Sequence, residues 1–324
     1  MKAVVYESYG GPEVLELRDL PKPVPRRKEL LIRVRAVEAT KSDCEMRSFR
    51  YSVSWFWLPM RIAMGIRKPR RPVLGFYFAG EIEAVGADVR GFAPGQAVYG
   101  SSNFQLGAYA EYLTVRASAA LSAKPESMSF TDAAAVPLGG WNALHFMDQA
   151  SLSPGDEILI NGAGGSIGSH AVQIARARGA RVTAVDRSDK ETGLRAFGAE
   201  DFINYQAQDF TRLGRQWDVI FDMVPGSAYR RCIQALKPGG RYLSGNPRLS
   251  TMIRTLLTNR FTDKRASFAF AQETRAGLAE LTEMIETGQL GSIVDTVYPL
   301  EQAAEAHRRV EDEQRVGAIV LEVA

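Results

Sequence analysis

The chain has 324 residues, of which 45% are hydrophobic and 24% charged, as is usual for a soluble globular protein with room for two domains. Its formal net charge of +3 is spread along the chain, which argues against a nucleic-acid-binding protein. No run of about 18 apolar residues and no leader-like apolar region behind Lys2 are present, so we expect a cytoplasmic protein without an integral membrane segment.

Short strands dominate the prediction for the first 125 residues. Apolar and partly alternating runs occupy residues 2–7, 14–20, 29–39, 77–86 and 108–117. Turns rich in glycine and proline separate these runs, and helical patterns are scarce between them. This arrangement predicts a barrel-like β domain.

Strands and helices alternate from about residue 129 onward. Residues 130–150 predict a helix with Thr131 as its N-cap, and residues 170–180 and 189–199 predict two more. Strands are expected at residues 157–161, 181–186, 201–205, 217–224 and 241–245. This alternation predicts a Rossmann-type, doubly wound parallel sheet with helices on both faces. Because strand patterns return in the tail, we expect residues 286–324 to complete the domain of residues 1–125, with residues 126–285 inserted.

A glycine-rich turn follows the predicted strand 157–161 and opens the next helix. It has the spacing Ala163-x-Gly165-x-x-Gly168, close to the dinucleotide fingerprint. A pyrophosphate binds well at a helix N-terminus, where N–H groups are free and the helix dipole is positive. Gly165 would let the backbone approach the phosphates, and Gly168 would let the helix pack on the strand. The predicted coenzyme-binding residues of this turn are Ala163, Gly164, Gly165, Ser166, Ile167 and Gly168; the alternative is a tight turn without a ligand.

Asp186 ends the next predicted strand, 18 residues after Gly168, where the fingerprint expects an acidic residue. A carboxylate there accepts hydrogen bonds from the ribose hydroxyls of NAD and repels the 2′-phosphate of NADP, which favours NADH slightly. Arg187 and Lys190 follow directly, and either side chain is suited to bind a 2′-phosphate. The coenzyme is therefore predicted to be NADPH or NADH.

With these motifs, the chain resembles the medium-chain dehydrogenase/reductase superfamily, and within it the zinc-free quinone oxidoreductase (zeta-crystallin-like) branch. The similar stretches are VYESYGGPEVLELRDLPKP, GFYFAGEIEAVGADVRGFAPGQAVYG, GAYAEYLTV, AAAVPLGGWNALHF, NGAGGSIGSHAVQIA and GAIVLEV. The resemblance implies an α/β fold with a GroES-like β-barrel catalytic domain, an inserted Rossmann domain and a cleft between them. It also implies a homodimer formed by pairing the edge strands of the Rossmann sheets.

Zinc is not expected. Zinc-dependent members of the superfamily carry a Cys ligand where this chain has Thr40 and a His ligand where it has Phe76. The cysteine-rich lobe that holds a structural zinc is also absent, and Cys44, four residues beyond Thr40, is read as an ordinary packing residue. The resemblance therefore implies a metal-free site.

A site without a strong Lewis acid suits the reduction of an activated acceptor better than the oxidation of an alcohol. In a quinone or an α,β-unsaturated carbonyl compound, the arriving negative charge spreads onto oxygen, where a hydrogen-bond donor stabilises it. We therefore expect a small hydrophobic carbonyl or quinone substrate. The alternatives are an NAD(P)-dependent alcohol or aldehyde dehydrogenase and a nucleotide-binding, redox-sensing module with little catalysis.

The resemblance also implies residue roles. Thr40, Lys41, Ser42 and Tyr77 lie where the superfamily arranges its chemistry; Thr40, Lys41 and Tyr77 replace an Asn, a Pro and an Asp that are common in the zinc-free branch. Further coenzyme-binding residues would be Tyr205, Val224 and Asn246, each near the end of a predicted strand. His145, on a helix that borders the coenzyme in the family, is a candidate for proton transfer, whereas His170 is expected to be structural.

An aromatic segment, residues 49–66, is followed by the basic run 67–71. In the family this region borders the substrate cleft. Three interpretations remain open: a lid that makes the cleft large and apolar, a contact with an anionic membrane surface, and plain packing against the barrel.

Overall fold

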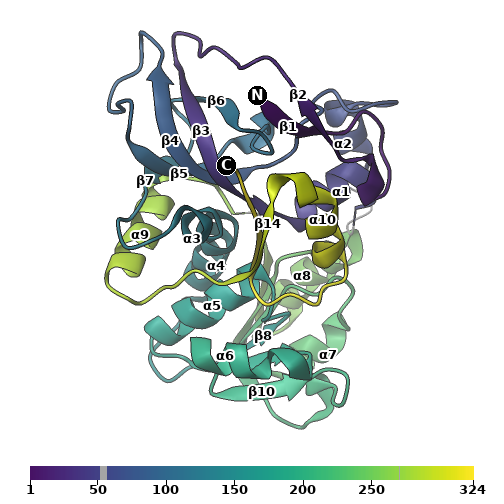
Figure 1. Ribbon diagram of the computed structural model, residues 1–324. Helices are drawn as coiled ribbons and strands as arrows, with labels where there is room; N and C mark the ends of the chain where they lie inside the picture. The colour runs from purple at the N-terminus through teal and green to yellow at the C-terminus, as the bar shows by residue number, and fades with distance from the viewer. Residues whose placement is uncertain (52–56, 270) are drawn as a thin grey trace.

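The computed structural model describes residues 1–51, 57–269 and 271–324. In Figure 1 a strand-rich part at the top stands on a helix-covered sheet at the bottom, and the yellow C-terminal segment returns to the top, where both termini lie. No helix in the described ranges combines the length and the apolar character that crossing a membrane would require.

The upper part is built on a seven-stranded sheet with the order β14-β15-β3-β4-β5-β7, in which β6 also pairs with β3. Its long central strand, Glu29–Ala39, is almost entirely buried. Strand β15 of the tail pairs antiparallel with this strand, so both ends of the chain contribute to one sheet. The other strands are β4 (Tyr77–Val85), β5 (Ala97–Ser101), β6 (Tyr112–Arg116), β7 (Leu121–Ala123), β14 (Val294–Pro299) and β15 (Ala318–Glu322), beside a small sheet of β1 (Lys2–Val5) and β2 (Glu16–Asp19).

The lower part holds a six-stranded, fully parallel sheet with the order β10-β9-β8-β11-β12-β13. The chain therefore winds outward from β8 in one direction and then returns to β11 on its other side, which confirms the predicted doubly wound sheet. The order reverses between β8 and β11, and such a switch point is where open α/β sheets bind ligands. The strands are β8 (Glu157–Asn161), β9 (Arg181–Asp186), β10 (Asp201–Asn204), β11 (Trp217–Asp222), β12 (Leu236–Ser244) and β13 (Arg265–Phe268).

Helices cover both faces of this sheet and connect it to the upper part. Helix α3 packs against β3 and β4, whereas α4 packs against α5 and α9. The helices are α1 (Lys41–Ser48), α2 (Trp57–Met64), α3 (Phe130–Ala134), α4 (Val136–Ala150), α5 (Ser166–Ala177), α6 (Glu191–Phe197), α7 (Tyr229–Gln234), α8 (Leu249–Phe261), α9 (Arg275–Glu286) and α10 (Ala303–Glu311).

The helix predicted at residues 130–150 differs in two respects. The N-cap is Ser129, whose hydroxyl accepts a hydrogen bond from the Asp132 N–H at 3.1 Å, so the predicted cap Thr131 is wrong. The helix is also divided at Ala135 into α3 and α4. Pro137 explains the division, because proline has no N–H to continue the hydrogen-bond ladder of the preceding turn.

Candidate active-site cleft

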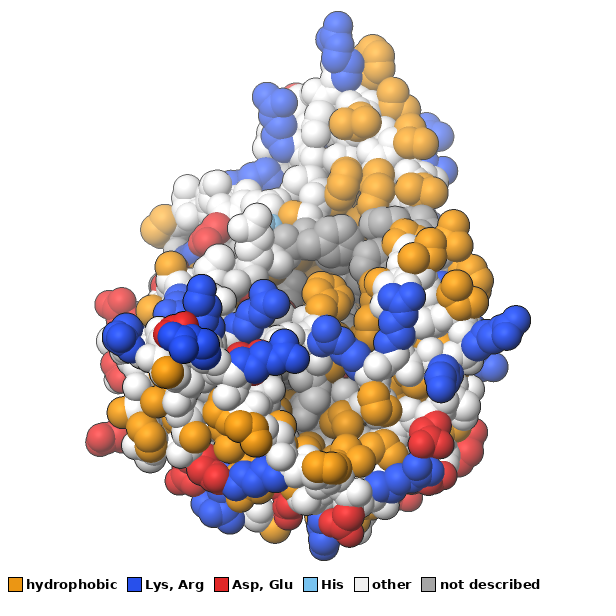
Figure 2. Space-filling view, turned by 90° about the horizontal axis from the view of Figure 1, so that it is seen from above, with side chains coloured by type: hydrophobic (Ala, Val, Ile, Leu, Met, Phe, Trp, Pro, Cys, Tyr) orange, Lys and Arg blue, Asp and Glu red, His pale blue; other side chains and the backbone are white. Residues whose placement is uncertain are grey.

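A cavity of about 1320 Å³ lies between the two sheets, at the switch point of the parallel sheet. Thr40 and Tyr77 line it from the upper part, and Gly162 and Met223 line it directly after the ends of β8 and β11. Seen from above, hydrophobic side chains border a hollow in the surface, and Lys and Arg side chains gather along its rim (Figure 2). The volume exceeds the range of roughly 300–1000 Å³ that is usual for one drug-sized ligand, so a dinucleotide and a second molecule can be accommodated.

The glycine-rich turn forms one wall of the cavity. Gly165 is the N-cap of α5 and has an extended backbone, with no side chain capping the helix. A Cβ atom at Gly165 would have the Gly162 oxygen, 3.9 Å away, as its nearest neighbour, so the backbone is open toward the cavity as a phosphate contact requires. At Gly168, by contrast, a Cβ atom would lie 2.3 Å from the same oxygen. Gly168 therefore permits the close approach of helix and turn.

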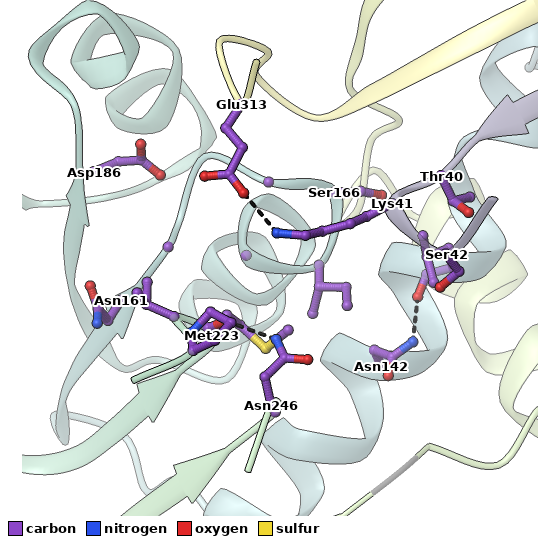
Figure 3. Close-up of a pocket in the computed structure, with 18 of the residues that line it drawn as sticks. Thr40, Lys41, Ser42, Asn142, Asn161, Ser166, Asp186, Met223, Asn246 and Glu313 are labelled. Carbon is purple, nitrogen blue, oxygen red and sulfur yellow. Dashed lines mark hydrogen bonds and ion pairs between the residues drawn. The ribbon is translucent and has the colours of Figure 1, made fainter. Parts of the chain in front are cut away.

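Asp186 lies at the far end of the cavity from Thr40 and Ser42 (Figure 3). Its carboxylate accepts a hydrogen bond from the Gly164 N–H at 2.7 Å and forms an ion pair with Lys190 Nζ at 3.0 Å. Both side chains are buried. Asp186 thus holds the glycine turn in place, and Lys190 neutralises the charge of the Asp186 carboxylate. Arg187 lies beside them and pairs with Asp189.

The other predicted coenzyme residues divide into two groups. Tyr205, Val224 and Asn246 line the cavity, and the Asn246 amide donates a hydrogen bond to the Met223 carbonyl oxygen at 2.8 Å (Figure 3). Ser166, Ile167, Arg187 and Lys190 also belong to the cavity wall. Ala163 and Gly164 lie behind this wall, because Ala163 is fully buried in the core and the Gly164 carbonyl oxygen accepts a hydrogen bond from the Gly317 N–H.

Thr40 lines the opposite end of the cavity, but Asp43 already engages its hydroxyl group. The hydroxyl donates a hydrogen bond to Asp43 Oδ2 at 2.6 Å and accepts one from the Asp43 N–H at 3.1 Å. The two residues form a capping box at the start of α1. Thr40 therefore holds the helix in place and has no hydroxyl hydrogen left for a substrate. The spacing Thr40-x-x-Asp43 is a sequence signal from which this role can be found.

We expect the Thr40→Ala substitution to lower the free energy of unfolding by about 1–2 kcal/mol, because it removes the cap of α1 and the hydrogen bond that the hydroxyl group donates to the buried Asp43 carboxylate. Chemical denaturation measures this loss. The matched control is Thr40→Ser, which keeps the hydroxyl group and should stay near the wild-type value. Equal stability of the Ala and Ser variants would contradict a capping role.

The remaining three predicted catalytic residues line the cavity with polar groups. Lys41 forms an ion pair with Glu313 at 2.7 Å across the top of the view in Figure 3. The Tyr77 hydroxyl donates a hydrogen bond to Glu273 at 2.7 Å, and burial together with this negative charge holds the pKa of Tyr77 well above its ordinary value. Ser42 is exposed to the cavity, and Lys41 and Ser42 therefore offer the most accessible donors.

Sequence reasoning missed several polar residues of the cavity wall. Glu38 is buried on β3, and burial raises the pKa of its carboxyl group to about 8. Glu313 and Arg315 come from the loop before β15, whose Gly317 N–H donates a hydrogen bond to the Gly164 carbonyl oxygen. No local sequence pattern predicts this contact between the loop before β15 and the glycine-rich turn. For Glu38, a charged residue inside the largely apolar strand 29–39 is a usable signal.

Among the described residues, the histidines and Cys44 stay outside the cavity wall, whereas Cys232 belongs to it. His145, the candidate for proton transfer, is not among the residues that line the cavity, and its Nε2 contacts Gln149 at 2.8 Å. His170 is buried, and burial lowers its pKa; its Nδ1 contacts the Ser166 carbonyl oxygen at 2.7 Å, as expected for a structural residue. Cys44 and Cys232 are buried and free.

The aromatic segment is partly described, because residues 52–56 lie outside the described ranges. Tyr51 and Met60 line the cavity, so the segment borders it. The guanidinium group of Arg61 lies over the rings of Tyr9 and Phe49, at 4.5 and 4.3 Å from their centroids. The outer side of α2 is apolar and exposed, with Leu58 as one example.

A catalytic zinc does not fit the residues at this site. Across residues 1–51, 57–269 and 271–324, no group of three or more His, Cys, Asp or Glu side chains is arranged to hold a metal ion. The hydroxyl group of Thr40 is engaged by Asp43, and Phe76 offers only carbon atoms. The described part of the wall therefore lacks the donor set of a catalytic zinc.

Comparison with known proteins agrees with both parts of the fold. Residues 26–126 match the alcohol dehydrogenase GroES-like domain, and residues 197–321 match the family described as zinc-binding dehydrogenase. The chain is 30% identical to a human quinone oxidoreductase over 96% of this chain and 94% of that protein. It is 26% identical to the 2-methylene-furan-3-one reductase of Solanum lycopersicum, over 99% of this chain and 79% of that protein.

A solved structure of the Escherichia coli quinone oxidoreductase in complex with NADPH superposes with a TM-score of 0.82. The two chains are 25% identical, and the match covers 99% of this chain and 100% of that one. The predicted fold class, a GroES-like domain with a Rossmann sheet, is thereby confirmed.

Proposed function

Because the chain belongs to the quinone oxidoreductase branch of the medium-chain dehydrogenase/reductase superfamily, we propose that it transfers a hydride from NADPH or NADH to a quinone or an α,β-unsaturated carbonyl compound. The relatives named quinone oxidoreductase and 2-methylene-furan-3-one reductase support these two acceptor classes. The reduced nicotinamide supplies the hydride when the coenzyme is bound.

One observation carries this proposal. The bare backbone of Gly165, at the N-terminus of α5, faces a cavity at the switch point of the parallel sheet. Unpaired N–H groups and the helix dipole make such a terminus attractive to a pyrophosphate. Asp186, Lys190 and Arg187 stand at the distal end, where the adenosine ribose would lie.

The acceptor would bind at the end lined by Lys41, Ser42 and Tyr77. Lys41 and Ser42 are exposed to the cavity and supply N–H and O–H donors for the oxygen atom that gains negative charge. Phe76, Met60 and Leu138 form apolar wall around these donors, which suits a hydrophobic ring or chain. These residues orient the acceptor and stabilise its charge without a metal ion.

The charge balance around Asp186 suits both coenzymes. The carboxylate is neutralised by Lys190 at 3.0 Å, so it repels a 2′-phosphate weakly and still offers oxygen atoms to a ribose hydroxyl group. We expect Asp186→Asn to shift the ratio of the NADPH and NADH dissociation constants at least about tenfold toward NADPH, because it frees Lys190 for the 2′-phosphate. The amide oxygen can still accept the Gly164 N–H bond, so the turn should stay in place.

Fluorescence titration with both coenzymes measures this shift. The matched control is Asp201→Asn, which removes an exposed carboxylate at the start of β10 and should leave the ratio unchanged. An Asp186→Asn variant with the wild-type ratio would show that this carboxylate has no part in coenzyme choice.

The proposed function is tested by titrating the protein with NADH and NADPH and then surveying quinones, enones and alcohols as substrates with the tighter coenzyme. Turnover with quinones or enones and little with alcohols is expected. Preference for alcohols would identify an alcohol dehydrogenase instead. Tight coenzyme binding without turnover on any acceptor would identify a redox-sensing module.

We also propose a homodimer formed through β13, which is an edge strand of the parallel sheet. Helix α8 packs beside β13. Thr255 and Thr258 of this helix are buried, whereas the side chains on its outer face are apolar and exposed. The exposed apolar side chains of α8 are Leu249, Ile253, Leu256, Leu257 and Phe261. An apolar helix face of this kind is suited to be covered by a partner.

Light scattering should therefore give twice the chain mass of 35.6 kDa for the wild-type protein. The Leu256→Glu substitution places a charge on the exposed face of α8 and should reduce this mass to that of one chain. A wild-type protein of one-chain mass at micromolar concentration would contradict the dimer.

A further inference from the structure

A buried carboxyl group without a hydrogen-bond partner lies in the wall of the cavity. Glu38 on β3 is 2% exposed, and its Oε2 atom has no partner among the described residues. The hydroxyl group of the neighbouring Ser166, a residue that is 5% exposed, lies close enough to Glu38 to lower the pKa of its carboxyl group, but it completes no hydrogen bond with it. Buried polar atoms are nearly always hydrogen-bonded. Two unpartnered polar groups on one cavity wall therefore point to a ligand that bonds them.

The strand register shows where Glu38 stands in the cavity. Val37 pairs with Phe78 in the antiparallel pair of β3 and β4, so the next residues along, Glu38 and Tyr77, stand opposite each other. Both line the cavity. On its other side Glu38 approaches Ser166, the first residue of α5, directly after Gly165. Glu38 thus lies between the acceptor end of the cavity and the turn where the pyrophosphate would bind.

We propose that Glu38 is a coenzyme-binding residue whose carboxyl group, together with the Ser166 hydroxyl, hydrogen-bonds an oxygen atom in the nicotinamide half of the coenzyme. This inference rests on the proposed function, since it requires that a nicotinamide coenzyme occupy the cavity.

The surroundings of Glu38 favour a protonated carboxyl group that donates this bond. Burial raises its pKa to about 8; the Ser166 hydroxyl and the positive charge of Arg315 oppose the rise, and Asp43 adds to it. Arg315 donates hydrogen bonds to the carbonyl oxygens of Val310 and Gly317, and its positive charge acts on Glu38 without a direct hydrogen bond to it. The titratable or charged groups that face Glu38 are Asp43 of α1, Tyr77 of β4, Tyr109 before β6, and Arg315 before β15.

Coenzyme affinity should therefore depend on pH. Below a pH of about 8 the neutral carboxyl group donates its bond, and above it a carboxylate would face the negatively charged pyrophosphate. Above this pH, binding requires uptake of a proton. The dissociation constant should therefore rise by a factor that approaches ten for each further pH unit. NADH is the suitable probe, because it lacks the 2′-phosphate, whose own pKa is about 6.

The experiment measures the dissociation constant of NADH by fluorescence from about pH 6.5 to about pH 9.5 for the wild type and two variants. Glu38→Gln keeps a hydrogen-bond donor and removes the titration, so it should bind as the wild type does near pH 7 and show a flat profile. Glu38→Leu removes the donor and should bind about tenfold more weakly near pH 7, also with a flat profile.

The control is Glu81→Gln, which removes the surface carboxylate that bonds Arg35 on β3 and should keep the wild-type pH profile. A wild-type dissociation constant that does not change with pH would overturn the inference, as would a pH-dependent slope that persists in Glu38→Gln. Failure of the wild type to bind either reduced coenzyme at any pH would instead refute the proposed function itself.

Discussion

The Gly165→Val substitution is expected to weaken the binding of NADPH and NADH at least about hundredfold while leaving the protein folded. The position has space for the new side chain, because a Cβ atom there has no protein neighbour closer than 3.9 Å. The branched side chain would, however, occupy the region of the cavity where the pyrophosphate meets the N-terminus of α5. Several charge-assisted hydrogen bonds, each contributing about 1.5–3 kcal/mol, would then be lost.

Fluorescence titration with both coenzymes measures the loss, and a thermal melt checks that the fold is kept. The matched control is Gly291→Val, a glycine outside the described cavity wall whose Cβ would meet only Gln173 Oε1 at 3.7 Å. It should bind both coenzymes as the wild type does. Unchanged coenzyme affinity in a folded Gly165→Val variant would rule out a phosphate site at this turn.

The Gly168→Ala substitution, three residues along the same motif, is expected to destabilise the fold itself. The free energy of unfolding should fall by about 3 kcal/mol. Its Cβ would lie 2.3 Å from the Gly162 oxygen and 2.7 Å from Ala163 Cα. These are backbone atoms of the turn, so relief requires α5 to move away from β8. Overpacking of this kind typically costs about 1–3 kcal/mol, and here no flexible side chain can yield.

Chemical denaturation and thermal unfolding measure this effect, and a loss of about 3 kcal/mol lowers Tm by at least roughly 5 °C. The matched control is Gly193→Ala in α6, where a Cβ meets only the side chains of Val316 at 3.6 Å and Phe197 at 3.8 Å. Because alanine favours helix more than glycine, this control should be neutral or slightly stabilising. A Gly168→Ala variant as stable as the control would disprove the close packing of turn and helix.

The parts of the fold that could be predicted from the sequence are those that local chemistry determines. The strand 157–161, the turn and α5 follow one another along the chain, so their spacing reveals a Rossmann unit and places Asp186 at the next strand end. The N-terminus of α3 also depends on local chemistry, but serine and threonine are both favourable N-cap residues, so Ser129 and Thr131 are equally plausible from the sequence. Only the observed hydrogen bond of Ser129 decides between them.

The parts of the candidate site that could not be predicted depend on contacts between distant segments. The loop before β15 contacts the glycine turn, where the Gly317 N–H donates a hydrogen bond to the Gly164 carbonyl oxygen. This contact brings Arg315 and Glu313 to the cavity. Glu38 could be noticed as a charge in an apolar strand, but its role depends on Ser166, which lies 128 residues further along the chain. Such pairings follow from tertiary packing and leave no periodic pattern.

We infer that this cleft passes a hydride from a reduced nicotinamide coenzyme to a conjugated acceptor without the help of a metal ion. The most direct test uses chelator-treated, metal-free protein, coenzyme with deuterium at both C4 positions of the nicotinamide, and an enone whose product is analysed by mass spectrometry. We predict that the product carries one deuterium on its β-carbon and that the rate equals that of untreated protein. A product without deuterium, or an activity that vanishes on chelation and returns with zinc, would contradict the account.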